Sequence, residues 1–414
     1  MHIVVIGAGI IGTSTAYALM QDGHYVTLID AAPHAGTQAS RANGGQLSYS
    51  FVAPLAEPAV LPQLPRWLLR EDSPLRWRPR ADPAQWRWIL SFLFACRRGL
   101  HQETTRDLLA LGMASRHALR QLVERESPAF DFTASGKLQV YGDTKSLDAA
   151  RRRTEFLASL GCPQQILSAA QCVAREPALA DMAGSIAGGV HTETEDAGDA
   201  HALCRYMEEG LRQSSRSQLM FETTVQGWRT SGLRVVALRT SRGELAADGY
   251  VLAGGVGSQA LAQRLGMDLG IYPLKGYSLT YALTPDSRAP TMSVSDIASK
   301  VVYARLGDRL RVAGMVDIGH VTTEIDAGRI TRMEQAVAQR FPRLNAAGAP
   351  SAWAGLRPAR PNGKPLIGPT RYDNLWLNTG HGMLGFTLAA GSARLLADQI
   401  AGRPTSLAGD LFQP

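Results

Sequence analysis

The sequence predicts an α/β fold that combines a parallel sheet, built around the first 30 residues, with a second, largely antiparallel sheet. Three observations carry this prediction. Residues 2–6 are β-branched and apolar, as in a buried parallel strand, and a glycine-rich turn follows them at once. Residues 249–258 form another apolar strand that ends in glycines and a serine, so they could return to the same sheet. Residues 272–281 and 300–316 have the composition of strands in an antiparallel sheet.

The glycine turn at residues 7–12 lies in the context that a dinucleotide-binding fingerprint requires. It joins the first strand to a helical stretch, and a second strand at residues 25–29 ends at Asp30. Gly7 makes the tight turn, Gly9 lets backbone N–H groups approach a pyrophosphate, and Gly12 lets the helix pack close to the strand. A carboxylate at Asp30 can accept hydrogen bonds from both ribose hydroxyls. It disfavours a 2′-phosphate, so the turn predicts FAD or NAD rather than NADP.

Two further stretches have chemistry suited to a flat, anionic ligand. Residues 35–48 crowd small hydroxyl, amide and glycine residues together, which is typical either of a loop that lays donors against a ring or of an ordinary surface loop. Residues 374–378 predict a strand, followed by a glycine turn and a long apolar helix at residues 384–401. The N-terminus of that helix would favour the negative charge of a reduced flavin.

Composition and charge limit the function classes. A chain of 414 residues with 45% hydrophobic residues and a formal charge of +7 is an ordinary globular protein of two or three domains, and no stretch suggests nucleic-acid binding. Four scattered cysteines predict neither a metal site nor a disulfide framework. The longest apolar block outside the first strand, residues 88–96, is too short to span a bilayer. We therefore expect a cytoplasmic protein with no secretion signal.

Residues 61–100 hold most of the tryptophans, interspersed with arginines and prolines. Such a segment suits a membrane interface or a partner surface. The alternative is that its aromatic residues cap the core of a substrate domain. Contact with the inner face of the cell membrane is thus open, as is oligomer formation.

Three stretches together resemble a known family: residues 272–278, residues 353–358 continuing through 363–368, and residues 374–382. With the fingerprint and the loop at residues 43–46, the chain resembles the FAD-dependent D-amino-acid dehydrogenases of the small-subunit type. These belong to the glycine oxidase and D-amino-acid oxidase superfamily. The resemblance covers nearly the whole chain. It implies a Rossmann-type FAD-binding domain interrupted by an α+β substrate domain whose antiparallel sheet lies over the flavin. We expect the FAD-binding domain at residues 1–50, 196–266 and 353–414, and the substrate domain at residues 51–195 and 267–352.

The resemblance also implies the site residues. Arg357, in a Gly-Leu-Arg-Pro motif, would clamp the substrate carboxylate, for which a planar guanidinium is well suited. Tyr277 would add a phenolic hydrogen bond or shape the pocket wall, with other tyrosines competing for that role. His381 is expected to contact the flavin rather than to act as a catalytic base. The expected cofactor contacts are Val5, Ile6, Gly7, Ala8, Gly9, Ile10, Ile11, Gly12, Asp30, Ala42, Asn43, Gly44, Gly45, Gln46, Val225, Gly254, Gly380, His381, Gly382, Leu384 and Gly385.

The activity implied is oxidative deamination of a D-amino acid. A hydride passes from Cα to flavin N5, the imine hydrolyses to a 2-oxo acid and ammonia, and the electrons pass to a quinone or another non-oxygen acceptor. Such chemistry demands no dedicated acid or base. Two alternatives stay open: an oxidase or dehydrogenase of secondary amino acids, hydroxyproline- or glycine-like, and a non-catalytic FAD-bearing subunit of a hetero-oligomer. Arg357 favours an enzyme, because a structural flavin needs no carboxylate clamp.

Overall fold

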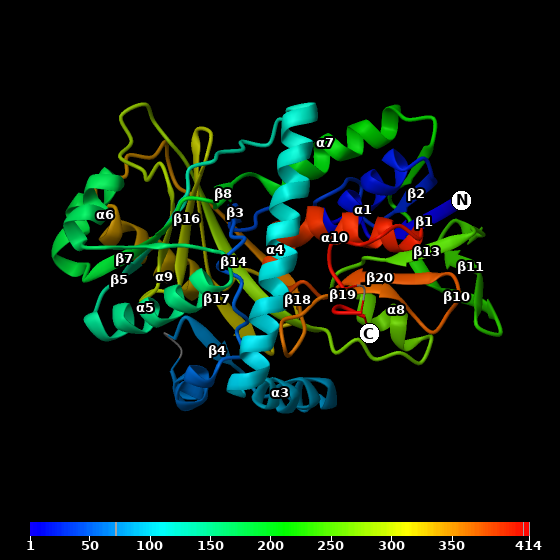
Figure 1. Cartoon of the computed structure of the whole chain (residues 1–414), viewed down its shortest axis with the longest axis horizontal. Coiled ribbons are helices and arrows are strands. Elements are labelled where there is room, and N and C mark those ends of the chain that lie inside the picture. Colours follow the sequence, from blue (N-terminus) through cyan, green and yellow to red (C-terminus); the bar gives the residue numbers. More distant parts are fainter. Residues whose placement is uncertain (71–72, 409, 414) are drawn as a thin grey trace.

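The computed structural model describes residues 1–70, 73–408 and 410–413. Its two main sheets lie at opposite ends of the molecule, and the long helix α4 (Arg98–Glu126) runs across the front between them (Figure 1). Both chain termini lie at the end that carries the parallel sheet (Figure 1).

The sheet around the N-terminus contains the predicted strands. Parallel pairs join β1 to β2 and β13, β13 to β20, and β2 to β9, whereas β19 runs antiparallel to β20 at the edge. The return of a distant segment to the first strand is therefore confirmed. Because β1, β13 and β20 are parallel, the turns that follow them lie at one edge of the sheet. In spatial order the strands are β19 (Leu366–Pro369), β20 (Leu375–Thr379), β13 (Gly249–Leu252), β1 (His2–Ile6), β2 (Tyr25–Ile29) and β9 (Ser217–Met220).

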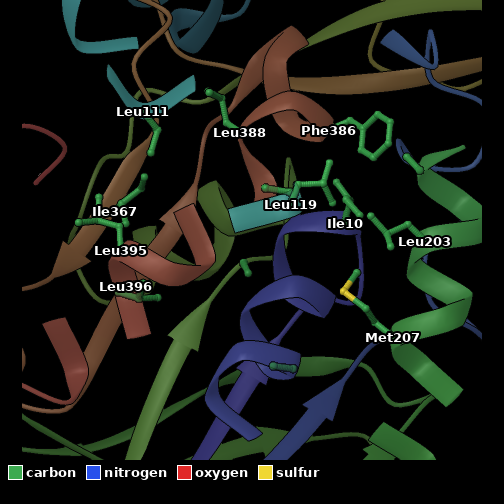
Figure 2. Packing of buried hydrophobic residues seen from close by; sticks show 14 of the residues in the cluster. Ile10, Leu111, Leu119, Leu203, Met207, Ile367, Phe386, Leu388, Leu395 and Leu396 are labelled. Carbon is green, nitrogen blue, oxygen red and sulfur yellow. The ribbon is translucent and has the colours of Figure 1, made fainter. Parts of the chain in front are cut away.

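Helices α1 (Ile10–Gln21), α10 (Gly385–Ile400) and α7 (Ala200–Gln213) pack together over this sheet, and α4 lies on α10. Figure 2 shows their apolar side chains meeting in one buried cluster, with Ile10 from α1, Leu203 and Met207 from α7, and Leu388 from α10. The cluster fixes the start of α1 and the start of α10 relative to the sheet edge.

The second sheet is largely antiparallel, as predicted, with parallel pairs at β5–β15 and β4–β17. The segment 300–316, predicted as a single strand region, is a hairpin of β16 and β17 that turns at Gly307 and Asp308. In spatial order the strands are β18 (Ser351–Ala359), β14 (Tyr272–Ala282), β17 (Arg309–Ile318), β16 (Val301–Leu306), β15 (Ser293–Asp296), β5 (Lys137–Tyr141), β7 (Gly188–Thr192) and β6 (Gln165–Leu167), with β4 (Leu75–Trp77) beside β17.

The predicted domain boundary at residue 353 cuts through β18, which pairs with β14 along its length. The division into domains otherwise stays a prediction. The remaining elements are β3 (Gln46–Leu47) with β8 (Asp196–Ala197), the sheet of β10 (Val225–Ser231), β11 (Arg234–Thr240) and β12 (Gly243–Leu245), α2 (Leu64–Leu69), α3 (Pro83–Ala95), α5 (Thr144–Ser159), α6 (Ala169–Arg175), α8 (Gly257–Gln263), α9 (Ala327–Arg340), and the 3₁₀ helices η1 (Pro58–Gln63), η2 (Pro177–Ser185) and η3 (Gly382–Leu384).

The tryptophans of residues 61–100 have mixed surroundings. Trp67, Trp77 and Trp88 are buried in one apolar cluster, where the Trp88 ring stacks on Phe92 at 5.3 Å. Trp86, by contrast, is 43% exposed on α3. Among the described residues, no helix combines the length and the apolar character that crossing a bilayer would need.

Candidate functional site

A cavity of about 1080 Å³ lies between the two sheets. Its lining joins the turn after β1, the loop after β2, the start of α10 and one face of the antiparallel sheet. The predicted fingerprint and the predicted substrate clamp therefore open into one space.

The glycines of the first turn fall into two groups. A Cβ on Gly7 would lie 2.6 Å from the Gly254 Cα, and one on Gly12 would lie 1.8 Å from the Gly7 carbonyl oxygen, so the packing of the chain itself requires both glycines. A Cβ on Gly9 would meet only the Ser40 Oγ at 3.6 Å, and one on Gly254 would come no closer than 3.6 Å to any atom, so both would make ordinary contacts. Both of these glycines line the cavity. The protein's own packing does not demand them, so their missing side chains leave room for a ligand, as a dinucleotide pyrophosphate requires.

Asp30 follows β2 at the same edge and also lines the cavity. Its Oδ2 accepts a hydrogen bond from the Ala8 N–H at 2.6 Å, and its Oδ1 accepts one from the Ala32 N–H at 2.8 Å. Each carboxylate oxygen can accept a further hydrogen bond. Asp30 is thus held in place and still suited to a pair of ribose hydroxyls.

The predicted loop at residues 35–48 is fixed against the antiparallel sheet, so it is not an ordinary surface loop. Ser278 donates to the Ala42 carbonyl at 2.7 Å, and Arg311 donates to the Asn43 carbonyl at 2.9 Å. The Gln46 amide donates to carbonyls of β15 and β16. These hydrogen bonds tie the loop to the antiparallel sheet. The backbone around Gly44 is then left to line the cavity.

Helix α10 begins at the cavity without a side-chain cap, so its first N–H groups remain available to an anion. His381 stands just before it, 2% exposed, with Nε2 at 2.9 Å from the Ser392 hydroxyl. Burial lowers the pKa of His381 to about 3. The imidazole is therefore neutral at pH 7 and serves packing and hydrogen bonding there.

Arg357 projects from β18 across the neighbouring strand. Its guanidinium lies directly over Gly276 of β14, where a Cβ would be 2.3 Å from Cζ, and Nη1 donates to the Met315 carbonyl at 3.2 Å. No carboxylate of the described residues forms an ion pair with it. Burial lowers the pKa of Arg357 to about 10, with the charge of Asp317 opposing the shift, so the group stays cationic at neutral pH. A half-buried cation with unused donors facing a cavity is a receptor for a carboxylate.

Tyr277 lies on the other face of β14. Consecutive strand residues point to opposite faces, so Gly276 faces the cavity and the Tyr277 ring faces the core beneath the sheet. The Tyr277 hydroxyl donates to Asp317 at 2.7 Å. The predicted hydrogen bond from this hydroxyl to a substrate carboxylate is therefore corrected. Tyr277 still belongs to the cavity lining, which keeps the predicted role in the wall open.

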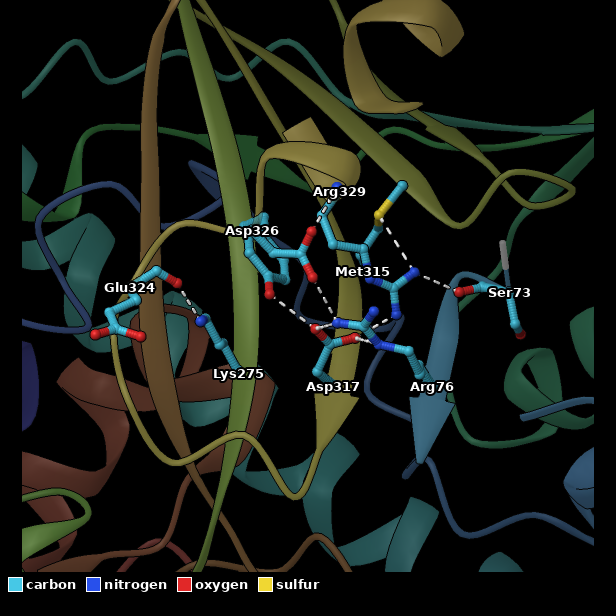
Figure 3. Close-up of polar contacts among 9 residues, drawn as sticks. Ser73, Arg76, Lys275, Met315, Asp317, Glu324, Asp326 and Arg329 are labelled. Atoms are coloured by element: carbon cyan, nitrogen blue, oxygen red, sulfur yellow. Dashed lines mark hydrogen bonds and ion pairs between the residues drawn. The ribbon is translucent and has the colours of Figure 1, made fainter. Parts of the chain in front are cut away.

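Asp317 is fully buried at the centre of a charge cluster (Figure 3). Arg76 donates to it from Nε at 3.2 Å and from Nη2 at 2.7 Å, and Arg329 donates to it as well. Burial alone would raise the pKa of Asp317, but the hydrogen bonds from Arg329 and Arg76 bring it below the usual value. Arg76 also binds Asp326, the N-cap of α9, so the cluster ties β4 and α9 to β17.

The predicted cofactor residues fall into two groups, those that line the cavity and those that lie outside its lining. Most of them line the cavity: Gly7, Ala8, Gly9, Ile10, Ile11, Asp30, Ala42, Asn43, Gly44, Gln46, Gly254, His381, Gly382, Leu384 and Gly385. The others lie outside that lining: Val5, Ile6, Gly12, Gly45, Val225 and Gly380. Val225 instead packs against the apolar cluster beneath the first sheet.

Sequence reasoning missed several lining residues. Ser40 accepts a hydrogen bond from the Ile10 N–H at 3.0 Å, and Trp353 folds its ring over Gly355 on the face that carries Arg357. Lys137 is buried at the start of β5. A signal existed for Trp353, because it lies four residues before Arg357 and an even spacing in a strand gives the same face. None existed for Lys137, whose neighbours come from distant segments.

The comparisons with known proteins agree with this geometry. The family model described as FAD dependent oxidoreductase matches residues 2–399. The chain belongs to that family of FAD-dependent oxidoreductases. It is 47% identical to D-amino acid dehydrogenase 2 of Ralstonia nicotianae over 99% of this chain and 98% of the relative. It is 44% identical to D-amino acid dehydrogenase 2 of Pseudomonas aeruginosa over 98% and 96%.

Solved structures extend the likeness to the fold. The glycine oxidase of Geobacillus kaustophilus superposes with a TM-score of 0.77 at 20% identity, covering 99% of this chain and 97% of that one. The L-proline dehydrogenase of P. horikoshii does so with a TM-score of 0.75 at 16% identity, covering 100% and 96%. The oxidoreductase therefore uses FAD, and the two-sheet architecture predicted for it is confirmed. The open glycines Gly9 and Gly254 and the uncapped α10 fit that cofactor.

Proposed function

We propose that this FAD-dependent oxidoreductase is a D-amino-acid dehydrogenase. The observation that carries the proposal is Arg357, a half-buried guanidinium that forms no ion pair with a carboxylate of the described residues, in the cavity that the fingerprint glycines also line. The two relatives named D-amino acid dehydrogenase support the same substrate class.

In this proposal Arg357 holds the substrate carboxylate through a planar, two-point contact, and Gly276 leaves the space in which the guanidinium lies. Such a clamp fixes the Cα of the substrate within the cavity. Bound FAD supplies the chemistry by accepting the Cα hydride at N5, and the imine is hydrolysed to a 2-oxo acid and ammonia. The fingerprint residues Gly9 and Asp30 would hold the pyrophosphate and the ribose. Neutral His381 shapes the start of α10 and carries no proton in the reaction.

The electrons are proposed to pass to a quinone or another non-oxygen acceptor, in a protein that works at the inner face of the cell membrane. The exposed apolar residues of the segment around α2 and α3 support this contact. They are Leu61, Leu68, Trp86, Leu90 and Phe94, and Arg66, Arg87, Arg97 and Arg98 are exposed among them.

An anaerobic titration of the purified holoprotein tests the substrate class. D-Alanine and a panel of other D-amino acids should bleach the flavin band, whereas the L-enantiomers should not. Bleaching by hydroxyproline-like or glycine-like substrates alone would favour the alternative substrates, and no bleaching by any amino acid would contradict the proposal. Oxygen consumption during turnover then separates an oxidase from a dehydrogenase.

A further inference from the structure

The cavity contains a second region of positive charge, away from Arg357. Lys137, the first residue of β5, donates from Nζ to the Ser48 hydroxyl at 2.7 Å, and its ammonium lies 4.4 Å from the centre of the Phe51 ring. Arg153 of α5 lies 5.4 Å from the same ring centre and donates to the Tyr141 hydroxyl at 2.7 Å. Lys137, Arg153, Phe51 and Ser48 all line the cavity.

In the described part of the chain, neither of these cations forms an ion pair with a carboxylate; the side chains that accept their hydrogen bonds are Ser48, Tyr141 and Gln139. The charge of Glu195 acts on Lys137 through space, but its Oε1 accepts from the Ser50 N–H at 2.8 Å and from the Ser50 hydroxyl at 2.5 Å rather than from Lys137. The direct hydrogen-bond partner of the Lys137 ammonium is the neutral Ser48 hydroxyl.

Burying an ammonium that no carboxylate contacts is costly. Lys137 is 2% exposed and uses one of its three N–H donors on Ser48. Burial, with the neighbouring Arg153 adding to it and Glu195 opposing it, lowers the pKa of Lys137 to about 8, so the group remains mainly charged at neutral pH. An anion that enters the cavity would offset this cost.

The region is separate from the Arg357 clamp. Strands β14, β17, β16 and β15 stand between β18, which carries Arg357, and β5, which carries Lys137. At about 4.8 Å per strand spacing, the two backbones lie roughly 24 Å apart across the sheet. A single carboxylate cannot bind both cations, so an anion at Lys137 is a second group.

We propose that Lys137 and Arg153, with Phe51 between them, form a second anion-binding site for a small organic ligand. The chemistry that it recognises is a carboxylate, or an equivalent anionic group, attached to an apolar or planar body. Two sources supply that chemistry: the side chain of an acidic substrate, or an anionic electron acceptor. The assignment of these sources rests on the proposed function, whereas the existence of the site does not.

The test compares Lys137→Met with Lys145→Met in the holoenzyme. Methionine keeps most of the length of Lys137 without its charge, and Lys145 is an exposed lysine at the start of α5 that serves as the control. Calorimetry and flavin difference spectra measure the binding of glutarate and butyrate, which share one carboxylate and differ in the second. Loss of a hydrogen-bonded charge should weaken glutarate binding about tenfold in Lys137→Met and leave butyrate unchanged.

A second arm of the same experiment uses electron acceptors. The Michaelis constant for the anionic dye dichlorophenolindophenol should rise in Lys137→Met, while that for the cationic phenazine methosulfate should not. A change in the glutarate arm assigns the site to the substrate, and a change in the dye arm assigns it to the acceptor. If neither changes, or if Lys137→Met loses its flavin while Lys145→Met keeps it, the second site is wrong.

Arg153→Gln keeps the test decisive if Lys137→Met does not fold. Arg153 is half-buried on α5, so its loss perturbs the core less, and it should shift the same arm in the same direction by a smaller factor. Binding of glutarate that depends on Lys137, in a protein that no D-amino acid reduces, would support this site while contradicting the proposed function. Failure of the second anion site and failure of the proposed dehydrogenase activity can thus be told apart.

Discussion

Replacing Gly276 by alanine should disturb the carboxylate clamp without disturbing the fold. The new Cβ would lie 2.3 Å from Cζ and Nη2 of Arg357 and 2.7 Å from Nη1. Carbon atoms pack at about 3.5 Å or more, so the guanidinium must move by more than about 1 Å. Gly276 pairs with Gly355 of β18 and is not at positive φ, so alanine is unstrained there although the pairing of β14 with β17 is irregular at this point. The displaced atoms are the end of a flexible side chain. The free energy of unfolding should therefore change little.

The catalytic consequence should be much larger. A misplacement of about 1 Å in a group that positions the substrate costs up to about a hundredfold, or roughly 2.7 kcal/mol of transition-state stabilisation. Steady-state kinetics with D-alanine and an artificial acceptor should show kcat/KM lowered by about tenfold to a hundredfold. Binding of propionate, a non-reacting carboxylate, should weaken in parallel when it is followed by the flavin spectrum.

Gly227→Ala provides the matched control. Gly227 is also a buried strand glycine beside an arginine, but its Cβ would lie 3.7 Å from Nη1 of Arg264, an ordinary contact. This variant should retain wild-type kinetics. If Gly276→Ala binds propionate and turns over D-alanine as well as Gly227→Ala does, the guanidinium over Gly276 is not the carboxylate clamp.

Three further predictions follow from the site and the surface. Gly9→Leu should fold but purify without flavin, because its side chain enters the cavity rather than the packed turn; full yellow colour would disprove the fingerprint assignment. The neutral state of buried His381 should make stability fall as pH drops below about 6.5, since the unfolded chain takes up a proton that the folded protein does not bind until about pH 3. The loss from pH 7 to pH 5 should be about 2 kcal/mol in urea unfolding, and His381→Gln should lack it while exposed His34→Gln retains it. Anionic vesicles should float the protein at low salt and release it at high salt, and a protein that stays soluble at low salt would make the exposed face of α3 purely structural.

The sequence located those parts of the site that depend on local order along the chain. The glycine turn, Asp30 and the strand before His381 were predictable because strand, turn and helix succeed one another within 30 residues and the parallel pairing brings their ends to one edge. The position of Arg357 came from the resemblance. The loop at residues 35–48 left two interpretations open, and the bonds from Ser278 and Arg311 decided between them.

Strand β14 shows why other parts were not predictable. Nearly every residue of this strand is buried, on both faces, so polarity does not indicate which side chains meet the cavity. The resemblance alone suggested Tyr277 for the substrate carboxylate or the pocket wall, and the sequence could not show that its neighbour Gly276 faces the cavity instead. Lys137 was equally hidden, because a single lysine before a strand gives no sign of burial until Ser48 and Phe51 are brought beside it.

The buried Asp317 cluster explains how Arg357 remains available in a protein interior that contains acidic groups. Asp317 follows Met315, a residue at φ +57° in the irregular part of β17, and the Met315 carbonyl holds Arg357. Arg329 contacts both sides of this irregularity, with Nη1 at 3.7 Å from the Met315 sulfur and a hydrogen bond to Asp317. Since Arg76 and Arg329 already neutralise Asp317, that carboxylate does not compete strongly for Arg357. Arg76 and Arg329 thus stabilise the backbone that orients Arg357. Because they neutralise Asp317, the positive charge of Arg357 remains available to a ligand.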